Sequence, residues 1–291
     1  MGAVYALLAA VGFSGKAILV KLAYGYSVDA VTLLALRMLF SLPFFIAIAV
    51  WSARNAGAVN LTARDWLSVV SLGLLGYYLS SLLDFLGLAY IPASLERLIL
   101  FLYPTMVVIL SALFLARRIT GGVVVALALS YVGIALVFAS DASLGQRNVV
   151  IGASLVFAST LTYAIYLVGS GQVIAKLGPA RFTGYALTVS CAAVVLHFGM
   201  VNAPAALIQP LPVYGMALAM ALFSTVLPAL LLAEGMRRIG ADKTSIIGSI
   251  GPVATIFLAY LFLGESLSVI QMAGAALVLA GVLFISLRKN S

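Results

Sequence analysis

Long apolar runs, separated by short polar or turn-forming segments, fill the chain from end to end. At 1.5 Å of rise per residue, a helical run of about 20 residues crosses the ~30 Å hydrocarbon layer of a bilayer. Membrane-spanning strands would instead alternate polar and apolar residues over roughly 10 positions, and these runs do not. The pattern therefore predicts an all-α integral membrane protein with ten transmembrane helices. The predicted spans are residues 2–22, 29–51, 66–88, 93–115, 121–140, 148–171, 181–201, 212–235, 243–263 and 268–287.

The composition agrees with a membrane protein and excludes several other classes. Hydrophobic residues make up 64% of the 291 positions and charged residues 8%, with a mean hydropathy of +1.22. A soluble domain carries about 25% charged residues. The single cysteine, Cys191, excludes an internal disulfide. The net charge of +8 is typical of basic cytoplasmic loops, and the sequence offers no soluble basic segment that would bind nucleic acid.

The distribution of lysine and arginine residues predicts the orientation in the membrane. If the N-terminus is cytoplasmic, most of these residues fall in inner loops and in the C-terminal tail, and few lie at the outer ends of the spans. Cytoplasmic loops of membrane proteins carry such an excess of basic residues. We therefore expect both termini to be cytoplasmic.

A shift of 148 residues aligns two long stretches of the chain without a gap. Residues 90–120 fall on residues 238–268, and Pro104 then meets Pro252. The chain divides into two halves of five predicted helices, and because five is odd the second half would enter the membrane from the opposite side. Inverted repeats of this kind are typical of secondary transporters, whose substrate cavity lies between the repeats near the midplane. The two predicted halves are residues 1–140 and 148–291.

Both aligned stretches carry a related motif, at the fourth and the ninth predicted helix. The first reads PAS…YPT…LFLAR and the second reads GAD…GPV…LFLGES. With the chain length, the helix number and the twofold repeat, this motif resembles the EamA-type transporters of the drug/metabolite transporter (DMT) superfamily over the whole chain. The resemblance implies a carrier of small metabolites in a bacterial inner (plasma) membrane, most similar to exporters of aromatic and other neutral amino acids. Arg117 and Arg118 stand where the family often has Gly-Glu, and Glu265 keeps the acidic position only in the second half, so Glu265 is assigned no transport role.

Three ionisable residues interrupt the apolar sequence around the predicted outer turn between the third and fourth helices, namely Asp84, Glu96 and Arg97. A charge at the bilayer centre costs ~2.5–3.5 kcal/mol and less near the interface, so these groups are expected to pair. Arg97 is expected to bridge to Asp84, while Glu96 faces Lys16 or Arg37, which lie at comparable depth. The group is either an ion-pair network that holds the outer helix ends together, or a gate in which a cation meets a substrate carboxylate.

A second charged group surrounds the predicted cytoplasmic turn between the eighth and ninth helices. It contains Glu234, Arg237 and Arg238, with Asp242 and Lys243 nearby. The repeat makes this turn the counterpart of the outer turn, and two clusters at opposite faces suit alternating access. An ordinary i,i+3 or i,i+4 pair on one helix explains Glu234 and its arginines equally well.

Stripes of polar and aromatic residues within the spans indicate a cavity, because polar side chains in a membrane face the interior or water. Such a cavity suits a substrate with an apolar or aromatic side chain, and its rings also attract an ammonium group. Prolines inside the predicted helices break the backbone hydrogen bonds and are either flexing points or static kinks. The candidates for substrate binding are Tyr77, Tyr78, Ser81, Tyr103, Tyr163, Tyr166, Lys16 and Arg37. The candidate flexing points are Pro104, Pro228 and Pro252.

Other functional classes find less support. The sequence has no metalloprotease or serine-hydrolase motif and only one histidine and one cysteine, so we predict neither an enzyme nor a metal or cofactor site. A channel usually needs a ring of like residues, and the inverted repeat favours a carrier. The alternative is a proton-coupled antiporter of multiple drugs or cationic compounds, which would favour an acidic residue at mid-membrane. The expected partners are a small-molecule substrate and the lipid bilayer, with no nucleic acid, and the oligomeric state stays open.

Overall fold

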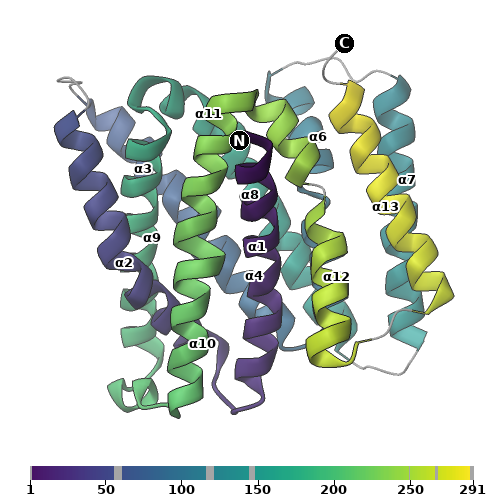
Figure 1. Ribbon diagram of the computed structural model, residues 1–291, viewed down its shortest axis with the longest axis horizontal. Coiled ribbons are helices and arrows are strands. Elements are labelled where there is room, and N and C mark those ends of the chain that lie inside the picture. Colours follow the sequence, from purple (N-terminus) through teal and green to yellow (C-terminus); the bar gives the residue numbers. More distant parts are fainter. Residues whose placement is uncertain are drawn as a thin grey trace.

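The computed structural model describes residues 2–55, 61–115, 121–143, 148–248, 250–265 and 268–288. Within these ranges the chain is helical, with short connections and no strand, so the predicted all-α class is confirmed. The helices stand side by side, and the start of α1 and the end of α13 lie at the same end of the molecule (Figure 1). The elements are α1 (Gly2–Tyr24), α2 (Ala30–Asn55), α3 (Ala63–Gly73), η1 (Leu74–Leu79), α4 (Ser80–Leu88), α5 (Ala93–Leu100), α6 (Tyr103–Leu115), α7 (Gly121–Ser143), α8 (Val149–Leu177), α9 (Pro179–Val201), η2 (Pro204–Leu207), α10 (Leu211–Ala221), η3 (Leu222–Val226), α11 (Leu227–Gly248), α12 (Ile250–Leu263) and α13 (Val269–Arg288).

Seven helical stretches in the described part are long and apolar enough to cross a membrane. Three shorter apolar stretches, Leu127–Val137, Gly251–Leu263 and Val269–Gly281, lie within α7, α12 and α13. They fall in the predicted fifth, ninth and tenth spans. Seven of the ten predicted spans are therefore present as helical stretches long and apolar enough to cross a membrane.

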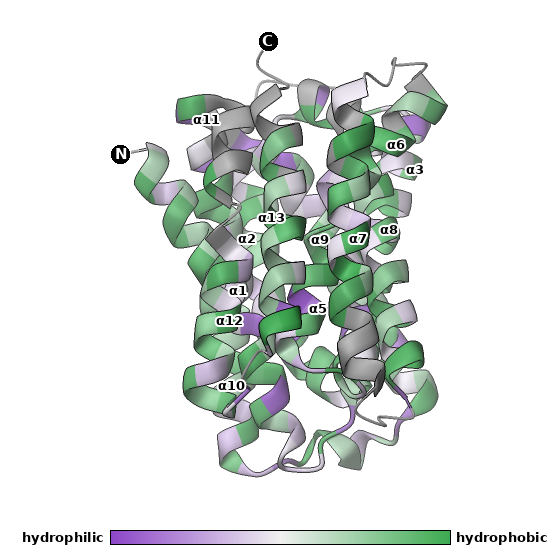
Figure 2. Cartoon of the chain, turned by 90° about the vertical axis from the view of Figure 1, so that its right-hand side faces the viewer, coloured by the Kyte–Doolittle hydropathy of each residue, from purple (hydrophilic) through white to green (hydrophobic). Residues whose placement is uncertain are grey.

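The outer surface is apolar, as a lipid-facing surface requires. Large hydrophobic side chains stand exposed on it, including Leu113, Phe257 and Leu261. Soluble monomers rarely expose continuous apolar patches of this kind. Figure 2 shows hydrophobic residues along most of the helices, with hydrophilic residues near the two ends and beside α5 in the interior.

The fourth predicted span, residues 93–115, is broken into α5 and α6. Proline has no N–H to donate to the carbonyl four residues earlier, and its ring crowds that carbonyl. Pro104 withholds this bond from Leu100, where α5 ends, and stands in the first turn of α6, where a missing N–H costs nothing. Pro252 lies within α12.

The predicted turn at residues 236–242 is helical, so the predicted limits of the eighth and ninth spans there are wrong. The C-terminal part of α11 passes through this segment and crosses the upper end of the molecule towards α12 (Figure 1). The corresponding turn in the first half contains Pro92, which has an extended backbone and precedes α5. The second half has Gly240 at that place, and a glycine costs a helix only about 1 kcal/mol.

Other irregularities recur with the same spacing of 148 residues. Two π-helical segments interrupt long helices, and η1 begins at Leu74 while η3 begins at Leu222. Pro228 follows η3 and withholds a bond from Ser224 within it, which explains why the helix widens there. Helix α1 packs against α11 and α12, much as α8 packs against α4, α5 and α6.

The most extensive helix contact lies at one side of the molecule, where α7 packs along α13 (Figure 1). A Cβ atom added at Gly133 would lie 2.5 Å from the Gly274 carbonyl oxygen, and one added at Gly274 would lie 2.6 Å from the Gly133 carbonyl oxygen. The two backbones therefore touch directly, as small residues allow in membrane helix pairs.

Candidate substrate site

A buried ion-pair group joins three helices in the interior. Lys16 of α1 donates a hydrogen bond from Nζ to the Asp84 carboxylate of α4, and Nζ lies 3.2 Å from Glu96 Oε1 of α5. The side chains of Asp84 and Glu96 are 3% and 0% exposed. A buried charge is tolerated only when it is paired, and one lysine here serves two carboxylates.

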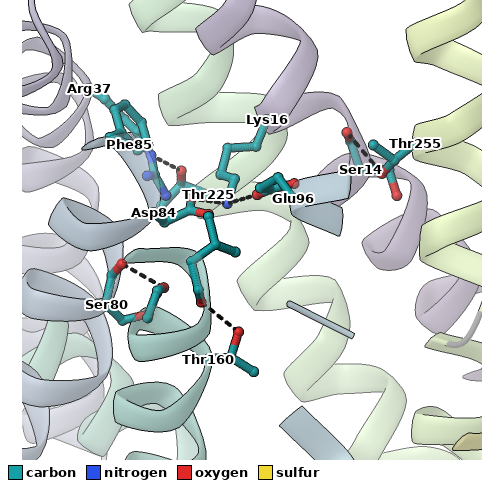
Figure 3. Close-up of polar contacts among 12 residues, drawn as sticks. Ser14, Lys16, Arg37, Ser80, Asp84, Phe85, Glu96, Thr160, Thr225 and Thr255 are labelled. Atoms are coloured by element: carbon teal, nitrogen blue, oxygen red, sulfur yellow. Dashed lines mark hydrogen bonds and ion pairs between the residues drawn. The ribbon is translucent and has the colours of Figure 1, made fainter. Parts of the chain in front are cut away.

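Arg37 of α2 extends this group. Its Nε donates a hydrogen bond of 2.9 Å to Thr225 Oγ1 of η3, and its guanidinium lies 5.4 Å from the centre of the Phe85 ring. It also interacts electrostatically with Asp84. Figure 3 shows Arg37, Asp84, Lys16 and Glu96 following one another, so that positive and negative groups alternate. We call these four residues the charge row.

Arg97 does not take the partner expected for it. Asp84 pairs with Lys16, so the expected bridge between Arg97 and Asp84 is wrong. Consecutive helical residues point about 100° apart, and only one of Glu96 and Arg97 can face α1 and α4. The Arg97 guanidinium lies instead against the backbone of Gly251 on α12, where an added Cβ atom would be 2.6 Å from Nη2.

Four of the predicted tyrosines form one cluster. Tyr77 of η1 and Tyr103 of α6 both meet the ring of Tyr163 edge-on, with centroid distances of 6.5 and 5.7 Å. Tyr166 stacks on Tyr163 at 5.8 Å and meets Tyr77 edge-on at 5.2 Å. A Cβ atom at Gly76 would overlap the Tyr166 ring, so this glycine makes room for the cluster. Such edge-on and stacked pairs are the favoured aromatic arrangements.

Two other cavity candidates lie apart from this cluster. The Tyr78 hydroxyl is 3.1 Å from His197 Nδ1 and faces α9. Ser81 is half-buried on α4, whereas its neighbour Ser80 makes the contact to α8. Ser159 of α8 donates a hydrogen bond of 2.7 Å to the Ser80 carbonyl oxygen, and the two hydroxyls are 3.1 Å apart.

The tyrosine cluster and the charge row are neighbours. Tyr77 interacts electrostatically with Arg37, and Tyr163 with Arg97. Tyr77 and Asp84 also lie seven residues apart on one continuous helical segment, and therefore on one face of it. Together the two groups present charges, hydroxyls and aromatic rings within one part of the interior.

The second predicted charged group is a local pair. Arg238 Nε donates a hydrogen bond of 2.5 Å to Glu234 Oε1 one turn away on α11, and its guanidinium lies 5.0 Å from the centre of the Tyr5 ring. Their side chains are 41% and 31% exposed. The side chains of Arg237, Asp242 and Lys243 lie outside those that the structure describes.

Glu265 has a structural role that the sequence analysis did not assign. It follows α12, and its carboxylate accepts hydrogen bonds from the Ala93 and Ser94 backbone N–H groups at 2.9 and 3.1 Å and from the Ser94 hydroxyl at 2.8 Å. A carboxylate at a helix start satisfies free N–H groups and complements the helix dipole. Glu265 thus fixes the start of α5, one turn before Glu96. In the sequence, Glu265 is visible only as an acidic residue after an apolar run. That pattern does not indicate which residues it contacts.

The described residues hold no group of three or more histidine, cysteine, aspartate or glutamate side chains that would bind a metal ion. In the described part of the chain, seven helical stretches long and apolar enough to cross a membrane, an apolar outer surface and buried charges in the interior define a multi-pass membrane protein with a polar centre. That arrangement is typical of transporters.

Comparison with known proteins identifies the family. The sequence profile described as the EamA-like transporter family matches residues 1–139 and 150–287. The chain belongs to this family, within the DMT superfamily, and is a transporter of that kind. The resemblance predicted from the repeated motif is confirmed.

Relatives support the family, and one of them has a stated substrate. An uncharacterized transporter, YcbK, of Bacillus subtilis is 33% identical over 98% of this chain and 91% of its own length. A probable terminal-alkyne amino-acid exporter of Streptantibioticus cattleyicolor is 28% identical over 84% of this chain and 80% of its own. One solved crystal structure covers 100% of this chain and 99% of its own with a TM-score of 0.67 at 18% identity, which shows the fold alone.

Proposed function

We propose that this transporter exports small metabolites, above all aromatic and other neutral amino acids, by alternating access. The observation that carries the proposal is the buried charge row beside the tyrosine cluster. An amino acid has an ammonium and a carboxylate group at one end and a side chain at the other. The charge row matches the charged end, and the tyrosine cluster matches the side chain. The substrate would sit between the halves 1–140 and 148–291, with the termini in the cytoplasm and the protein in the inner (plasma) membrane.

Several features support two related halves. The family profile matches the chain twice, once in each half. The π-helical segments that begin at Leu74 and Leu222 share the 148-residue spacing of the sequence repeat. In an inverted repeat, corresponding irregularities would border one central site from opposite sides.

The substrate class draws support from chemistry and from one relative. Aromatic side chains bind rings by stacked and edge-on contacts, and buried cations bind carboxylates. The Streptantibioticus relative is described as a probable exporter of an amino acid. Tyr77, Tyr103, Tyr163 and Tyr166 would then contact the substrate side chain, while Lys16, Arg37 or Arg97 would serve its carboxylate.

The test is counterflow of labelled amino acids in liposomes that contain the purified protein, without an imposed ion gradient. We expect saturable exchange of aromatic and neutral amino acids. Tyr163→Ala should weaken exchange of aromatic substrates about 10-fold, because the substrate ring loses its contact with Tyr163 and the neighbouring tyrosine rings lose theirs. Tyr260→Ala, on the exposed outer surface, is the matched control and should exchange normally. Equal losses in both variants would contradict a substrate role for Tyr163.

A second candidate is a proton-coupled antiporter of cationic compounds, and one observation favours it. In the sequence, Asp84 and Glu96 lie near the ends of predicted helices, but both side chains are buried in the interior. Buried acids of this kind serve proton and cation transport in other membrane proteins. Movement of only a cationic dye, and only with a proton gradient, would support this candidate and exclude amino-acid exchange.

A further inference from the structure

The polar atoms of the charge row are not all satisfied by one another. Among the described residues, buried side-chain atoms without a hydrogen-bond partner include the donors Arg37 Nη1 and Arg97 Nε and the acceptors Asp84 Oδ1 and Glu96 Oε2. Glu96 Oε1 has only its ion pair with Lys16 at 3.2 Å. Arg37 is 5% exposed and Glu96 0%. Nearly all buried polar groups in proteins are hydrogen-bonded, so a concentration of exceptions calls for an explanation. Five of the eight such atoms among the described residues belong to the charge row or to the adjacent Arg97.

The unsatisfied atoms contain both signs of charge. The donors belong to positively charged guanidinium groups and the acceptors belong to carboxylates. A ligand that satisfies both kinds needs an acceptor and a donor, and one that also matches their charges carries a negative and a positive group. The ammonium and carboxylate of an α-amino acid lie about as far apart as neighbouring members of an ion pair, and Lys16 Nζ is 3.2 Å from Glu96 Oε1 within the row.

The net charge of the charge row also favours a ligand that carries both a positive and a negative group. Two cations alternate with two anions, so the formal charges of the row cancel. A zwitterion adds no net charge, whereas a simple cation or anion brings an uncompensated charge into a buried site, which is costly. Arg97 stands at the edge of the row and interacts electrostatically with Glu96. It makes an anion less unfavourable than a cation.

We infer that the charge row is the recognition site for the zwitterionic head of an α-amino acid, with Glu96 accepting its ammonium group and Arg37 Nη1 donating to its carboxylate. The inference rests on the proposed function and deepens it. The Asp84–Lys16 ion pair stays intact and holds the two recognising groups apart. The tyrosine cluster next to Arg37 then receives the side chain, so head and side chain are recognised separately.

The test compares three compounds that share a phenyl ring. L-Phenylalanine carries both charges, 3-phenylpropionate lacks the ammonium group and 2-phenylethylamine lacks the carboxylate. Their competition against labelled L-phenylalanine exchange is measured in liposomes. We expect 3-phenylpropionate to compete about 30-fold less well or worse, since a buried charge loses its partner. We expect 2-phenylethylamine to be weaker still, because it adds a positive charge beside Arg97. Equal competition by either analogue would overturn the inference.

Variants of Glu96 and Arg37 test which residue binds the ammonium group and which binds the carboxylate. Glu96→Gln keeps the shape of the side chain and should weaken L-phenylalanine about 30-fold while changing 3-phenylpropionate much less. Arg37→Gln should do the reverse, weakening both carboxylates and sparing 2-phenylethylamine. Glu234→Gln, in the exposed pair on α11, is the matched control and should leave all three compounds unchanged. An equal loss for all three compounds in Glu96→Gln would mean a structural role and overturn the inference.

A separate measurement distinguishes failure of this inference from failure of the proposed function. Ligand-induced thermal stabilisation of the detergent-purified protein reports binding without transport. If no amino acid is exchanged, the proposed function fails, and stabilisation by L-phenylalanine but by neither analogue still supports zwitterion recognition. If exchange is normal but the analogues stabilise as well as L-phenylalanine, the carrier stands and the recognition site is wrong.

Discussion

The charge row and the Glu234–Arg238 pair use the same chemical groups in opposite settings. The row draws its members from α1, α2, α4 and α5, and its carboxylates are fully enclosed. The pair lies within one helix, and both of its side chains are about one-third exposed or more. Removing one partner of a buried pair costs ~3–5 kcal/mol, whereas an exposed pair contributes ~0–1 kcal/mol. Burial therefore decides which charged group the protein depends on.

The largest effect is expected for Lys16→Ala. This change leaves two enclosed carboxylates without their shared cation, and it should lower the free energy of unfolding by ~3–5 kcal/mol. Denaturant unfolding in detergent measures it, and Lys16→Arg, which keeps the charge, should recover most of the loss. A loss below about 1 kcal/mol would place the row in the same energetic class as the exposed pair.

A smaller effect is expected for Glu265→Gln, which tests whether the row depends on its surroundings. The amide offers one acceptor oxygen in place of two and loses the charge at the start of α5, so unfolding should become ~1–2 kcal/mol easier. Substrate affinity should fall as well, because Glu96 lies one turn further on. Unfolding and exchange assays on the same preparation measure both. An unchanged affinity would show that Glu96 does not need this cap.

A third charged group, outside the membrane spans, extends the comparison to pH. Asp29 accepts hydrogen bonds from the Val31 and Thr32 N–H groups at 3.0 Å and from the Asn202 side chain. Burial raises its pKa, but the hydrogen bonds from Thr32, Asn202 and Val31 outweigh this and leave the pKa below its ordinary value. The contribution of Asp29 to stability is then complete above the ordinary aspartate pKa of about 3.9 and is lost as the pH falls through the lower folded value.

Asp29→Asn makes this pH dependence measurable. The stability difference between the wild type and the variant should be constant at neutral pH and shrink only in strong acid. Thermal unfolding of both proteins from pH 7 to pH 3 gives the curve. A difference that disappears between pH 7 and pH 5 would contradict the depressed pKa.

The smallest effect is expected for Glu234→Gln. An exposed i,i+4 pair contributes ~0.3–0.5 kcal/mol, and salt screens it. The unfolding midpoint should therefore move little, and the small shift should vanish at high ionic strength. A loss comparable with that of Lys16→Ala would mean that residues beyond the exposed pair depend on Glu234.

Features that depend on residues close together in the sequence were predicted correctly. Apolar runs gave the helices, and polar stripes brought Tyr77 and Tyr163 to the same part of the interior. The predicted partner of Asp84, Arg97, is wrong, because the actual partner Lys16 lies 68 residues away and several cations were at similar predicted depth. The Glu265 cap crosses 172 residues to Ala93 and was missed for the same reason.

The predicted ends of the helices agree with the structure only where a single residue fixes the helix boundary. Pro92 ends the first hairpin, and Gly240 at the equivalent place leaves α11 continuous. The repeat alignment treated the two places as alike, although only proline forbids the helix there. Three of the predicted spans contain only shorter apolar stretches in the described part. The site roles of the candidate residues depend on a substrate, and the exchange and competition assays address them directly.

The contact between Gly133 and Gly274 has a mechanical consequence. Two backbones in direct contact leave no side chain that could change its conformation to let one helix slide or tilt against the other. Helices α7 and α13 therefore act as one stiff strut at the side of the protein. A rocking motion would have to bend the chain elsewhere, for example at the break between α5 and α6 before Pro104.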